Sequence, residues 1–276
     1  MEVTARPHDL LRLTGAAALN SPLPEWAQAS LGGPFPAWAR LSLGDPLPES
    51  ARASLGDSLP EWAQASLGGP LPEWVRTSLD ACPWVVVRRA PHPPGLIPAG
   101  VRGPERRHRH AVLVPAGAVI RSVPPEKVAA RRPRLPRLAA TLAAIAVRLA
   151  DEPDAAVWGP TGSLGFELAT GEPVTHLGSD VDLLIRTPRR LEPAWAARLV
   201  AAFAALPGTV DCQLETPCGG VSLTEWARSD GPVLARTDHG PHLVDDPWAP
   251  MARTDHGPRP VDDPWTPRGP HPQGFA

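Results

Sequence analysis

The stretch Ser-Asp-Val-Asp-Leu-Leu-Ile at residues 179–185 combines two acidic side chains with a run typical of a buried strand. Side chains alternate between the two faces of a strand, so Asp180 and Asp182 are predicted to project from the same face. Same-face positions lie about 6.5 Å apart, given the rise of a strand. Carboxylates at that spacing can share one or two Mg²⁺ ions, which prefer oxygen ligands. Because paired metal ions clamp the oxygens of a phosphoryl displacement, the stretch predicts a metal-dependent phosphoryl-transfer site.

Upstream of this stretch lies a predicted phosphate-binding turn. The run Gly-Pro-Thr-Gly-Ser at residues 159–163 follows a short apolar run and precedes a predicted short helix at residues 166–169. Glycine at a turn between a strand and a helix allows backbone N–H groups to approach a phosphate closely. Gly162 and Ser163 are therefore candidate substrate-binding residues.

A second predicted strand, residues 209–215, carries a third carboxylate. Asp211 shares one face of this strand with two other polar residues, so it could bind a metal or take a proton from the nucleophile. Taken alone, the pair of carboxylates at residues 180 and 182 has a simpler interpretation, in which Asp180 caps a turn and Asp182 lies on a solvated edge. The turn and the third carboxylate favour the catalytic interpretation.

Longer stretches of the chain resemble one enzyme family. They are Trp-Gly-Pro-Thr-Gly-Ser-Leu-Gly-Phe-Glu-Leu-Ala-Thr-Gly at 158–171, Ser-Asp-Val-Asp-Leu-Leu at 179–184 and Val-Asp-Cys-Gln-Leu-Glu-Thr-Pro at 210–217, with shorter matches at 6–11, 83–90, 97–103, 233–237 and 246–248. Together they resemble the malonate decarboxylase holo-acyl-carrier-protein synthases, also called phosphoribosyl-dephospho-CoA transferases. That family is placed within the nucleotidyltransferase superfamily related to DNA polymerase beta.

The resemblance implies a reaction, a cofactor and a partner. The donor would be 2′-(5″-triphosphoribosyl)-3′-dephospho-CoA. A serine hydroxyl of the apo acyl-carrier subunit of malonate decarboxylase would attack its α-phosphate, and diphosphate would leave. Asp180 and Asp182 would hold Mg²⁺, and Asp211 would complete the metal site or help to deprotonate the serine. Two alternatives stay open: a nucleotidyltransferase with a different acceptor, either a small molecule or a protein hydroxyl, and a non-enzymatic binding protein based on repeats.

A basic stretch at residues 102–110 offers a cationic site for a triphosphate, because arginine makes charge-assisted contacts with phosphate. Arg102 is the substrate-binding candidate, since it lies in a family-like Gly-Val-Arg-Gly. A solvated loop is the alternative interpretation of the same stretch.

The expected fold class is α/β (α+β): a nucleotidyltransferase-like mixed sheet flanked by helices, with a smaller N-terminal subdomain and a repeat insertion. Predicted helices at residues 135–150 and 191–206 alternate with strands, as in an α/β layer. Five segments are expected, namely an N-terminal segment at 1–21, five tandem twelve-residue repeats at 22–81, the N-terminal subdomain at 82–130, the catalytic domain at 131–250 and a duplicated tail, predicted to be disordered, at 251–276.

The repeats follow the pattern Pro-Leu-Pro-Glu-Trp-Ala-Gln-Ala-Ser-Leu-Gly-Gly, and each predicts a short helix that begins after proline and ends at glycine. They could form a binding array, or they could be tandem duplications of one native segment, the copy at 70–81. The second interpretation predicts that a protein lacking residues 22–69 keeps most of its activity. An assay of the purified deletion protein tests this, and a folded but inactive deletion protein would contradict it.

Bulk properties narrow the class of protein further. The net charge of −2 gives no global field that favours nucleic acid or a membrane surface. The first twenty residues lack the features of a signal peptide, and the most apolar helical stretch, residues 138–150, is too short to span a bilayer. The three cysteines match no zinc spacing and are predicted to be buried free thiols. We therefore expect a cytoplasmic protein without a nucleic-acid or membrane partner.

Overall fold

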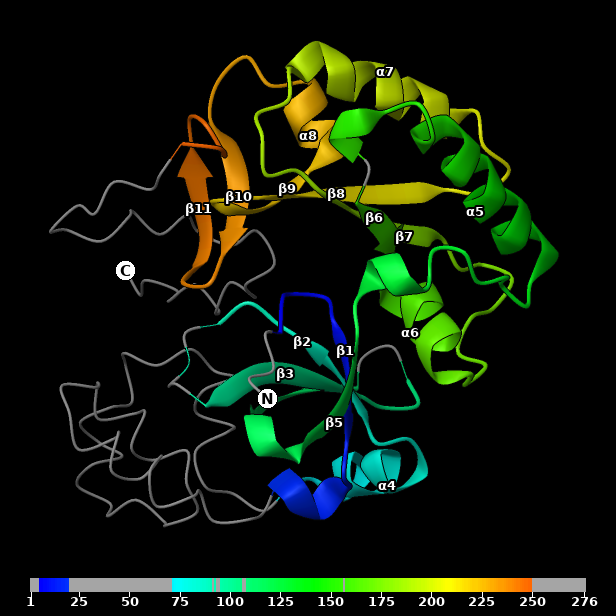
Figure 1. The fold of residues 1–276 in the computed structure, drawn as a ribbon, viewed down its shortest axis with the longest axis vertical. Coiled ribbons are helices and arrows are strands. Elements are labelled where there is room, and N and C mark those ends of the chain that lie inside the picture. The colour runs from blue at the N-terminus through cyan, green and yellow to red at the C-terminus, as the bar shows by residue number, and fades with distance from the viewer. Residues whose placement is uncertain are drawn as a thin grey trace, which may run out of the picture.

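Two β-sheets organise the computed structural model, one in each half of the chain (Figure 1). The structure describes residues 5–19, 71–90, 92, 95–105, 108–155 and 157–249. Apart from most of the copy at 70–81, the tandem repeats lie outside the described residues, as does the duplicated tail at 251–276. Within the described part of the chain, no helix combines the length and the apolar character that crossing a membrane requires.

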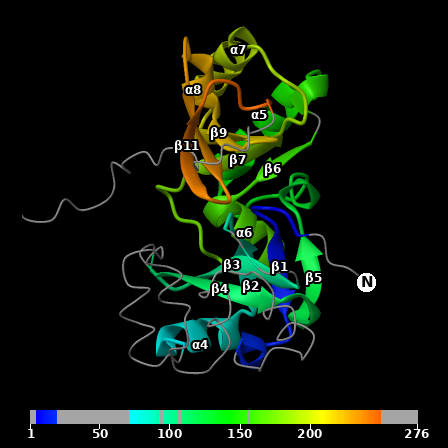
Figure 2. The same cartoon turned by 90° about the vertical axis from the view of Figure 1, so that its left-hand side faces the viewer.

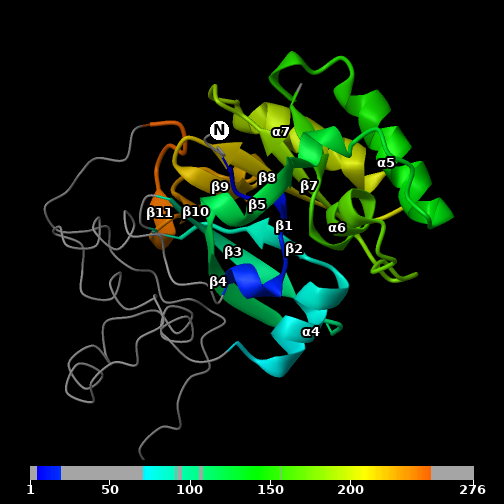
Figure 3. The same cartoon turned by 60° about the horizontal axis from the view of Figure 1, so that its bottom comes forward.

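The N-terminal sheet has five strands in the order β4-β3-β2-β1-β5, and all of its neighbours are antiparallel. Its strands are β1 (Leu10–Leu13), β2 (Trp84–Val87), β3 (Leu96–Arg102), β4 (Arg109–Pro115) and β5 (Val119–Val123). The 3-10 helix η1 (Ala16–Leu19) and the helix α4 (Glu73–Ala81) pack beside each other against one face (Figure 3). Leu11, Val75 and Leu79 are fully buried in the small core between them.

The C-terminal sheet has six strands in the order β11-β10-β9-β8-β7-β6. They are β6 (Trp158–Pro160), β7 (Val181–Arg186), β8 (Val210–Thr216), β9 (Gly219–Ser222), β10 (Val233–Thr237) and β11 (Gly240–Val244). The sheet is mixed, because β7 and β8 are parallel while the other neighbours are antiparallel. The chain crosses from β7 to β8 through the helix α7 (Pro193–Ala204).

Helices α5 (Pro136–Leu149) and α7 cover the face of this sheet that points away from the N-terminal sheet (Figures 1 and 2). The apolar stripe of α5, with Leu142 and Ile145, packs on the buried strand residues Leu183 and Leu214. The opposite face of the sheet is turned toward the N-terminal sheet. Helix α6 (Gly162–Thr170) packs against β6 and β7, and α8 (Leu223–Ala227) packs beside α7. The 3-10 helices η3 (Ala116–Ala118), η4 (Pro125–Lys127) and η5 (Pro153–Ala155) complete the connections.

The mixed α/β class expected from the sequence is confirmed, and both long helices are found within one or two residues of their predicted starts. Several strands were not predicted, including β1, β5, β9 and β11. β5 is short, and the exposed residues Ile120, Arg121 and Ser122 follow one another, so its apolar and polar residues do not alternate as in a strand pattern. β1 lies between β2 and β5, so the first residues of the chain belong to the same sheet as residues 84–123.

Candidate functional site

The parallel pairing of β7 with β8 brings two of the predicted carboxylates together. Asp182 on β7 lies directly opposite Asp211 on β8 in the strand register. Neighbouring strands are about 4.7–4.9 Å apart, so the two side chains project side by side from the same face of the sheet. Asp182 is half-buried and Asp211 is exposed. Both residues line a cleft of about 870 Å³ between the two sheets.

Asp180 lies in the connection immediately before β7 and is exposed. It is not among the residues that line the cleft. The connection itself is held from the side of α5, because Arg137 donates a hydrogen bond to the carbonyl oxygen of Ser179 and Arg134 donates one to that of Thr175. These contacts fix the backbone on which Asp180 stands, next to the start of β7.

The predicted turn between β6 and α6 packs directly against β7. The N–H of Thr161 donates a 2.8 Å hydrogen bond to the carbonyl oxygen of Asp182. Gly162 follows with a φ of +57°, and a methyl group built on it would overlap the carboxylate oxygen Oδ2 of Asp182. Only glycine therefore lets the start of α6 and this carboxylate lie against each other. Ser163, the next residue, is half-buried in the first turn of α6 and is not among the cleft residues.

Replacing Gly162 by alanine is expected to lower catalytic activity by about tenfold or more, because the added methyl group displaces the Asp182 carboxylate. Alanine at positive φ also destabilises the fold by about 1–2 kcal/mol. Gly171, which ends α6 with a φ of +86°, has no atom within 4 Å of the corresponding methyl position and is the matched control. Gly171→Ala should show the loss of thermal stability without the loss of specific activity. Equal activity in the two variants would contradict the proposed contact.

The wall of the cleft that faces the carboxylates is cationic. From the N-terminal sheet it receives Arg88, Arg102, Arg109 and His110, and from β10 of the C-terminal sheet it receives Arg236. The guanidinium carbon of Arg102 lies 5.8 Å from the centre of the Phe166 ring in α6, so this side chain reaches across to the C-terminal half. The residues predicted to form a basic loop are in part strand residues, because Arg102 and Arg109 pair with each other at the ends of β3 and β4.

The three cysteines are free thiols, as predicted; Cys212 and Cys218 are buried, whereas the prediction of burial is wrong for Cys82, which is half-buried. Cys212, which alternates with Asp211 on β8, is buried in the core, and burial raises the pKa of its thiol. Among the described residues, no group of three His, Cys, Asp or Glu side chains is gathered as a metal site would require. The acidic part of the cleft is thus the pair Asp182 and Asp211.

Comparison with known proteins decides the family. The model for the phosphoribosyl-dephospho-CoA transferase MdcG N-terminal domain matches residues 6–125, and the model for the MdcG C-terminal domain matches residues 127–247. The phosphoribosyl-dephospho-CoA transferase of Pseudomonas aeruginosa is 44% identical over 165 residues, which are 59% of this chain and 79% of that protein. The chain belongs to the phosphoribosyl-dephospho-CoA transferase family.

Relatives with the same name in Azotobacter vinelandii and Klebsiella pneumoniae are 44% and 42% identical, and the chain covers 79% and 80% of them. No solved structure matches the chain. The boundary between the two family models, at residues 125–127, coincides with the passage from one sheet to the other, since β5 ends at Val123 and α5 begins at Pro136. The cleft of this transferase-family member therefore lies between its two family domains.

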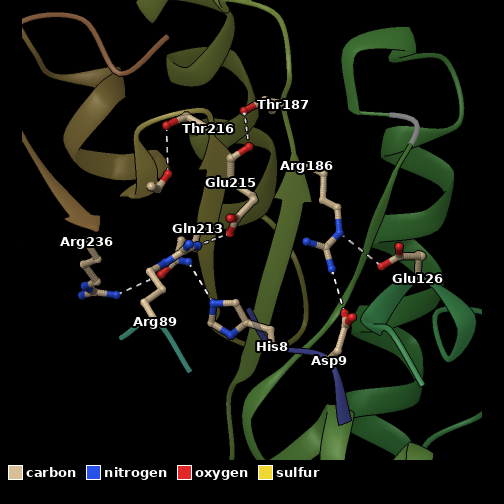
Figure 4. Close-up of polar contacts among 11 residues, drawn as sticks. His8, Asp9, Arg89, Glu126, Arg186, Thr187, Gln213, Glu215, Thr216 and Arg236 are labelled. Carbon is tan, nitrogen blue, oxygen red and sulfur yellow. Dashed lines mark hydrogen bonds and ion pairs between the residues drawn. The ribbon is translucent and has the colours of Figure 1, made fainter. Parts of the chain in front are cut away.

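A hydrogen-bonded chain across the cleft was not predicted from the sequence (Figure 4). Arg236 donates to Oε1 of Gln213 at 3.1 Å, which turns the Gln213 amide nitrogen toward His8. That nitrogen lies 3.0 Å from Nε2 of His8. Because the amide nitrogen can only donate, Nε2 of His8 accepts, and the ring proton resides on Nδ1. His8 has a φ of +72°, which is unusual for a residue other than glycine.

His8 is held in its neutral form. Burial, followed by the charges of Arg89, Arg186 and Arg236, lowers the pKa of His8 to about 4. The unfolded chain binds a proton near pH 6.5 and the folded chain does not, so stability is expected to fall as the pH drops from 6.5 toward 4.

Denaturant unfolding at several pH values, with His8→Asn as the comparison, tests this prediction. Asparagine tolerates positive φ but does not titrate, so the variant should show a flatter pH dependence between pH 6.5 and 4. Parallel pH profiles for the two proteins would contradict the assignment.

Next to the hydrogen bonds of His8, Gln213 and Arg236, ion pairs join the two halves of the molecule (Figure 4). Arg186, at the end of β7, is 9% exposed and contacts Asp9 at 3.1 Å and Glu126 at 3.4 Å. Asp9 is itself buried, and burial raises the pKa of its carboxyl group. Arg89 and Glu215 form a second ion pair between the sheets. These contacts fix the N-terminal sheet against the C-terminal sheet, and hence the width of the cleft.

Proposed function

We propose that this protein transfers the phosphoribosyl-dephospho-CoA group from 2′-(5″-triphosphoribosyl)-3′-dephospho-CoA to a serine of the apo acyl-carrier subunit of malonate decarboxylase. The pairing of Asp182 with Asp211 in a cleft whose other wall carries arginines is the observation that supports phosphoryl transfer. Carboxylates on one side and guanidinium groups on the other suit a reacting α-phosphate and its departing diphosphate. The names of the relatives support the transferred group, and the resemblance to the malonate decarboxylase enzymes supports the acceptor.

In the proposed reaction the serine oxygen forms a bond to the α-phosphorus while the bond from the α-phosphorus to the bridging oxygen of the diphosphate breaks. The product is a phosphodiester on the carrier serine, and the diphosphate leaves with the bridging oxygen. The carboxylate of Asp211, which is exposed and lines the cleft, either takes the serine proton or completes the metal site, in which case the proton passes to water. The cationic residues Arg88, Arg102 and Arg109 would bind the triphosphate, and the start of α6 at Gly162 and Ser163 would approach the leaving phosphates.

The donor atoms of the cleft fit Mg²⁺. Magnesium is usually bound by one or two carboxylates together with substrate phosphates and water, and Asp182 with Asp211 supplies two carboxylates. Asp180 remains a proposed third oxygen ligand, although its side chain lies outside the cleft lining. When bound, the ion would neutralise negative charge that develops on the phosphate oxygens.

Three broader proposals accompany this function. A strand–helix–strand unit that joins the parallel β7 and β8, with carboxylates on both, supports a nucleotidyltransferase-like catalytic domain related to DNA polymerase beta. The repeats at residues 22–69 would be an insertion into the N-terminal domain between β1 and β2. A cytoplasmic location agrees with the three free thiols, which suit a reducing compartment.

The test is whether the protein attaches the phosphoribosyl-dephospho-CoA group to the purified apo-carrier subunit in the presence of Mg²⁺. Attachment is measured as an increase in the intact mass of the carrier subunit. We expect a gain equal to phosphoribosyl-dephospho-CoA with the triphosphoribosyl donor and none with ATP. A nucleotidyl mass gained from ATP alone would overturn the donor and support a nucleotidyltransferase with another substrate. No gain from either donor in a folded protein would support the repeat-based binding protein.

A further inference from the structure

A second cavity of about 630 Å³ also lies between the two sheets. Arg88 lines both this cavity and the cleft, so the two spaces meet at that side chain. The N-terminal sheet contributes Ile97 and Pro98 to its walls, and the C-terminal half contributes Pro217. Nothing in the proposed chemistry at Asp182 uses this space.

The second cavity differs from the cleft in charge. Its walls include the ion pair of Arg89 and Glu215, whose side chains are 13% and 17% exposed and which neutralise each other across the sheets. The other two charged lining residues, Arg88 and Asp238, carry opposite charges, and about half of the remaining lining is alanine, valine, isoleucine, leucine and proline. A neutral, partly apolar chain suits such walls better than a polyphosphate does, because an anion gains little from arginine that is already paired.

We propose that the second cavity binds the pantetheine arm of the donor while the triphosphate end lies in the cleft. This inference rests on the proposed function. The donor has a polyanionic reacting end and, beyond its adenosine diphosphate unit, a neutral arm of methylene and amide groups that ends in a thiol. A cavity of about 300–1,000 Å³ suits one drug-sized ligand, and this donor is longer. The two spaces that meet at Arg88 supply the necessary length, with Arg88 placed to contact the diphosphate that precedes the arm.

Gly117, in η3, allows a direct test because it lines the second cavity and has no atom within 4 Å of the position that a methyl group would take. Gly117→Trp should therefore place a bulky side chain at the cavity wall without a clash at its Cβ atom. Gly231 also has an unobstructed methyl position but lines neither cavity, so Gly231→Trp is the matched control. Thermal unfolding of both variants checks that they fold as the parent does.

The measurement is calorimetric binding of 3′-dephospho-CoA and of ADP, which is the same nucleotide without the pantetheine arm. We expect Gly117→Trp to weaken the binding of 3′-dephospho-CoA about tenfold and to leave ADP binding unchanged. Gly231→Trp should alter neither. In the transfer assay, Gly117→Trp should raise the KM for the full donor with little change in kcat.

The outcomes separate this inference from the proposed function. If the parent transfers the group but Gly117→Trp binds 3′-dephospho-CoA as the parent does, the arm lies elsewhere and the function stands. The parent could show no transfer and yet bind 3′-dephospho-CoA better than ADP, with this difference lost in Gly117→Trp. In that case the cavity assignment stands and the reaction is wrong. If the parent binds 3′-dephospho-CoA no better than ADP, the cavity assignment is wrong.

Discussion

Replacing Asp182 by asparagine should lower the rate of group transfer by at least about 10²–10³-fold while the protein stays folded. Asparagine has nearly the same shape as aspartate but lacks the charge that faces the cleft beside Asp211. The loss of one preorganised electrostatic group in an active site typically lowers kcat by this factor. The measurement is the initial rate of mass gain on the carrier subunit at saturating donor and Mg²⁺.

Asp230→Asn is the matched control for that experiment, because Asp230 is exposed after α8 and lines neither cavity. It should react at the parent rate. Asp180→Asn in the same series decides between two forms of the metal site. A loss similar to that of Asp182→Asn would support three carboxylate ligands, whereas a rate close to the parent would leave Asp182 and Asp211 as the pair. Retention of more than a tenth of the parent rate by Asp182→Asn would contradict the proposed role.

Replacing Arg186 by methionine should lower the free energy of unfolding by about 3–5 kcal/mol, because a buried carboxylate at Asp9 then loses its partner. The methionine fills much of the space of the arginine stem, so loss of charge rather than loss of volume dominates. Arg189 is the matched control, since it lies three residues later, in the connection after β7, and forms an exposed ion pair with Asp154. Arg189→Met should cost about 0–1 kcal/mol. Urea unfolding of the two variants measures both values.

The loss of unfolding free energy in Arg186→Met should also depend on pH. Burial raises the pKa of Asp9, and removal of the neighbouring guanidinium raises it further. At low pH Asp9 is protonated in the folded variant, so no unpaired charge remains in the interface. The stability difference between parent and variant should therefore shrink as the pH falls from 8 toward 4. A difference that grows over this range would contradict the assignment of Arg186 and Asp9 as a buried pair.

The strands that carry the carboxylates were predictable because each has a short apolar run with alternating polar residues. Cys212 is buried in the core, as predicted for the cysteines, whereas its neighbour Asp211 is exposed on the other face of β8. The register of β7 against β8 could not be predicted, because it depends on how α7, which connects the two strands, packs on the sheet. That register selects Asp182, and not Asp180, as the neighbour of Asp211.

The cleft residues that come from the N-terminal half were harder to predict from the sequence. His8 stands before a four-residue strand, and nothing in its neighbourhood indicates that Gln213 will be its partner more than two hundred residues later. The partners of Arg186 are also distant in sequence. The basic stretch at residues 102–110 gave the correct wall of the cleft but the wrong local structure, because alternating arginine and histidine conceal the start of β4 at Arg109.

The placement of η1 and α4 side by side on the N-terminal sheet has a consequence for how the gene can change. Leu19 and Leu71 both pack against the same small core, so the chain leaves and re-enters the sheet domain at neighbouring points. Even for a fully unstructured connection, each doubling in length raises the closure free energy by only about 0.6 kcal/mol. Adding or removing whole twelve-residue copies at this place in the gene should therefore change the stability of the domain only slightly.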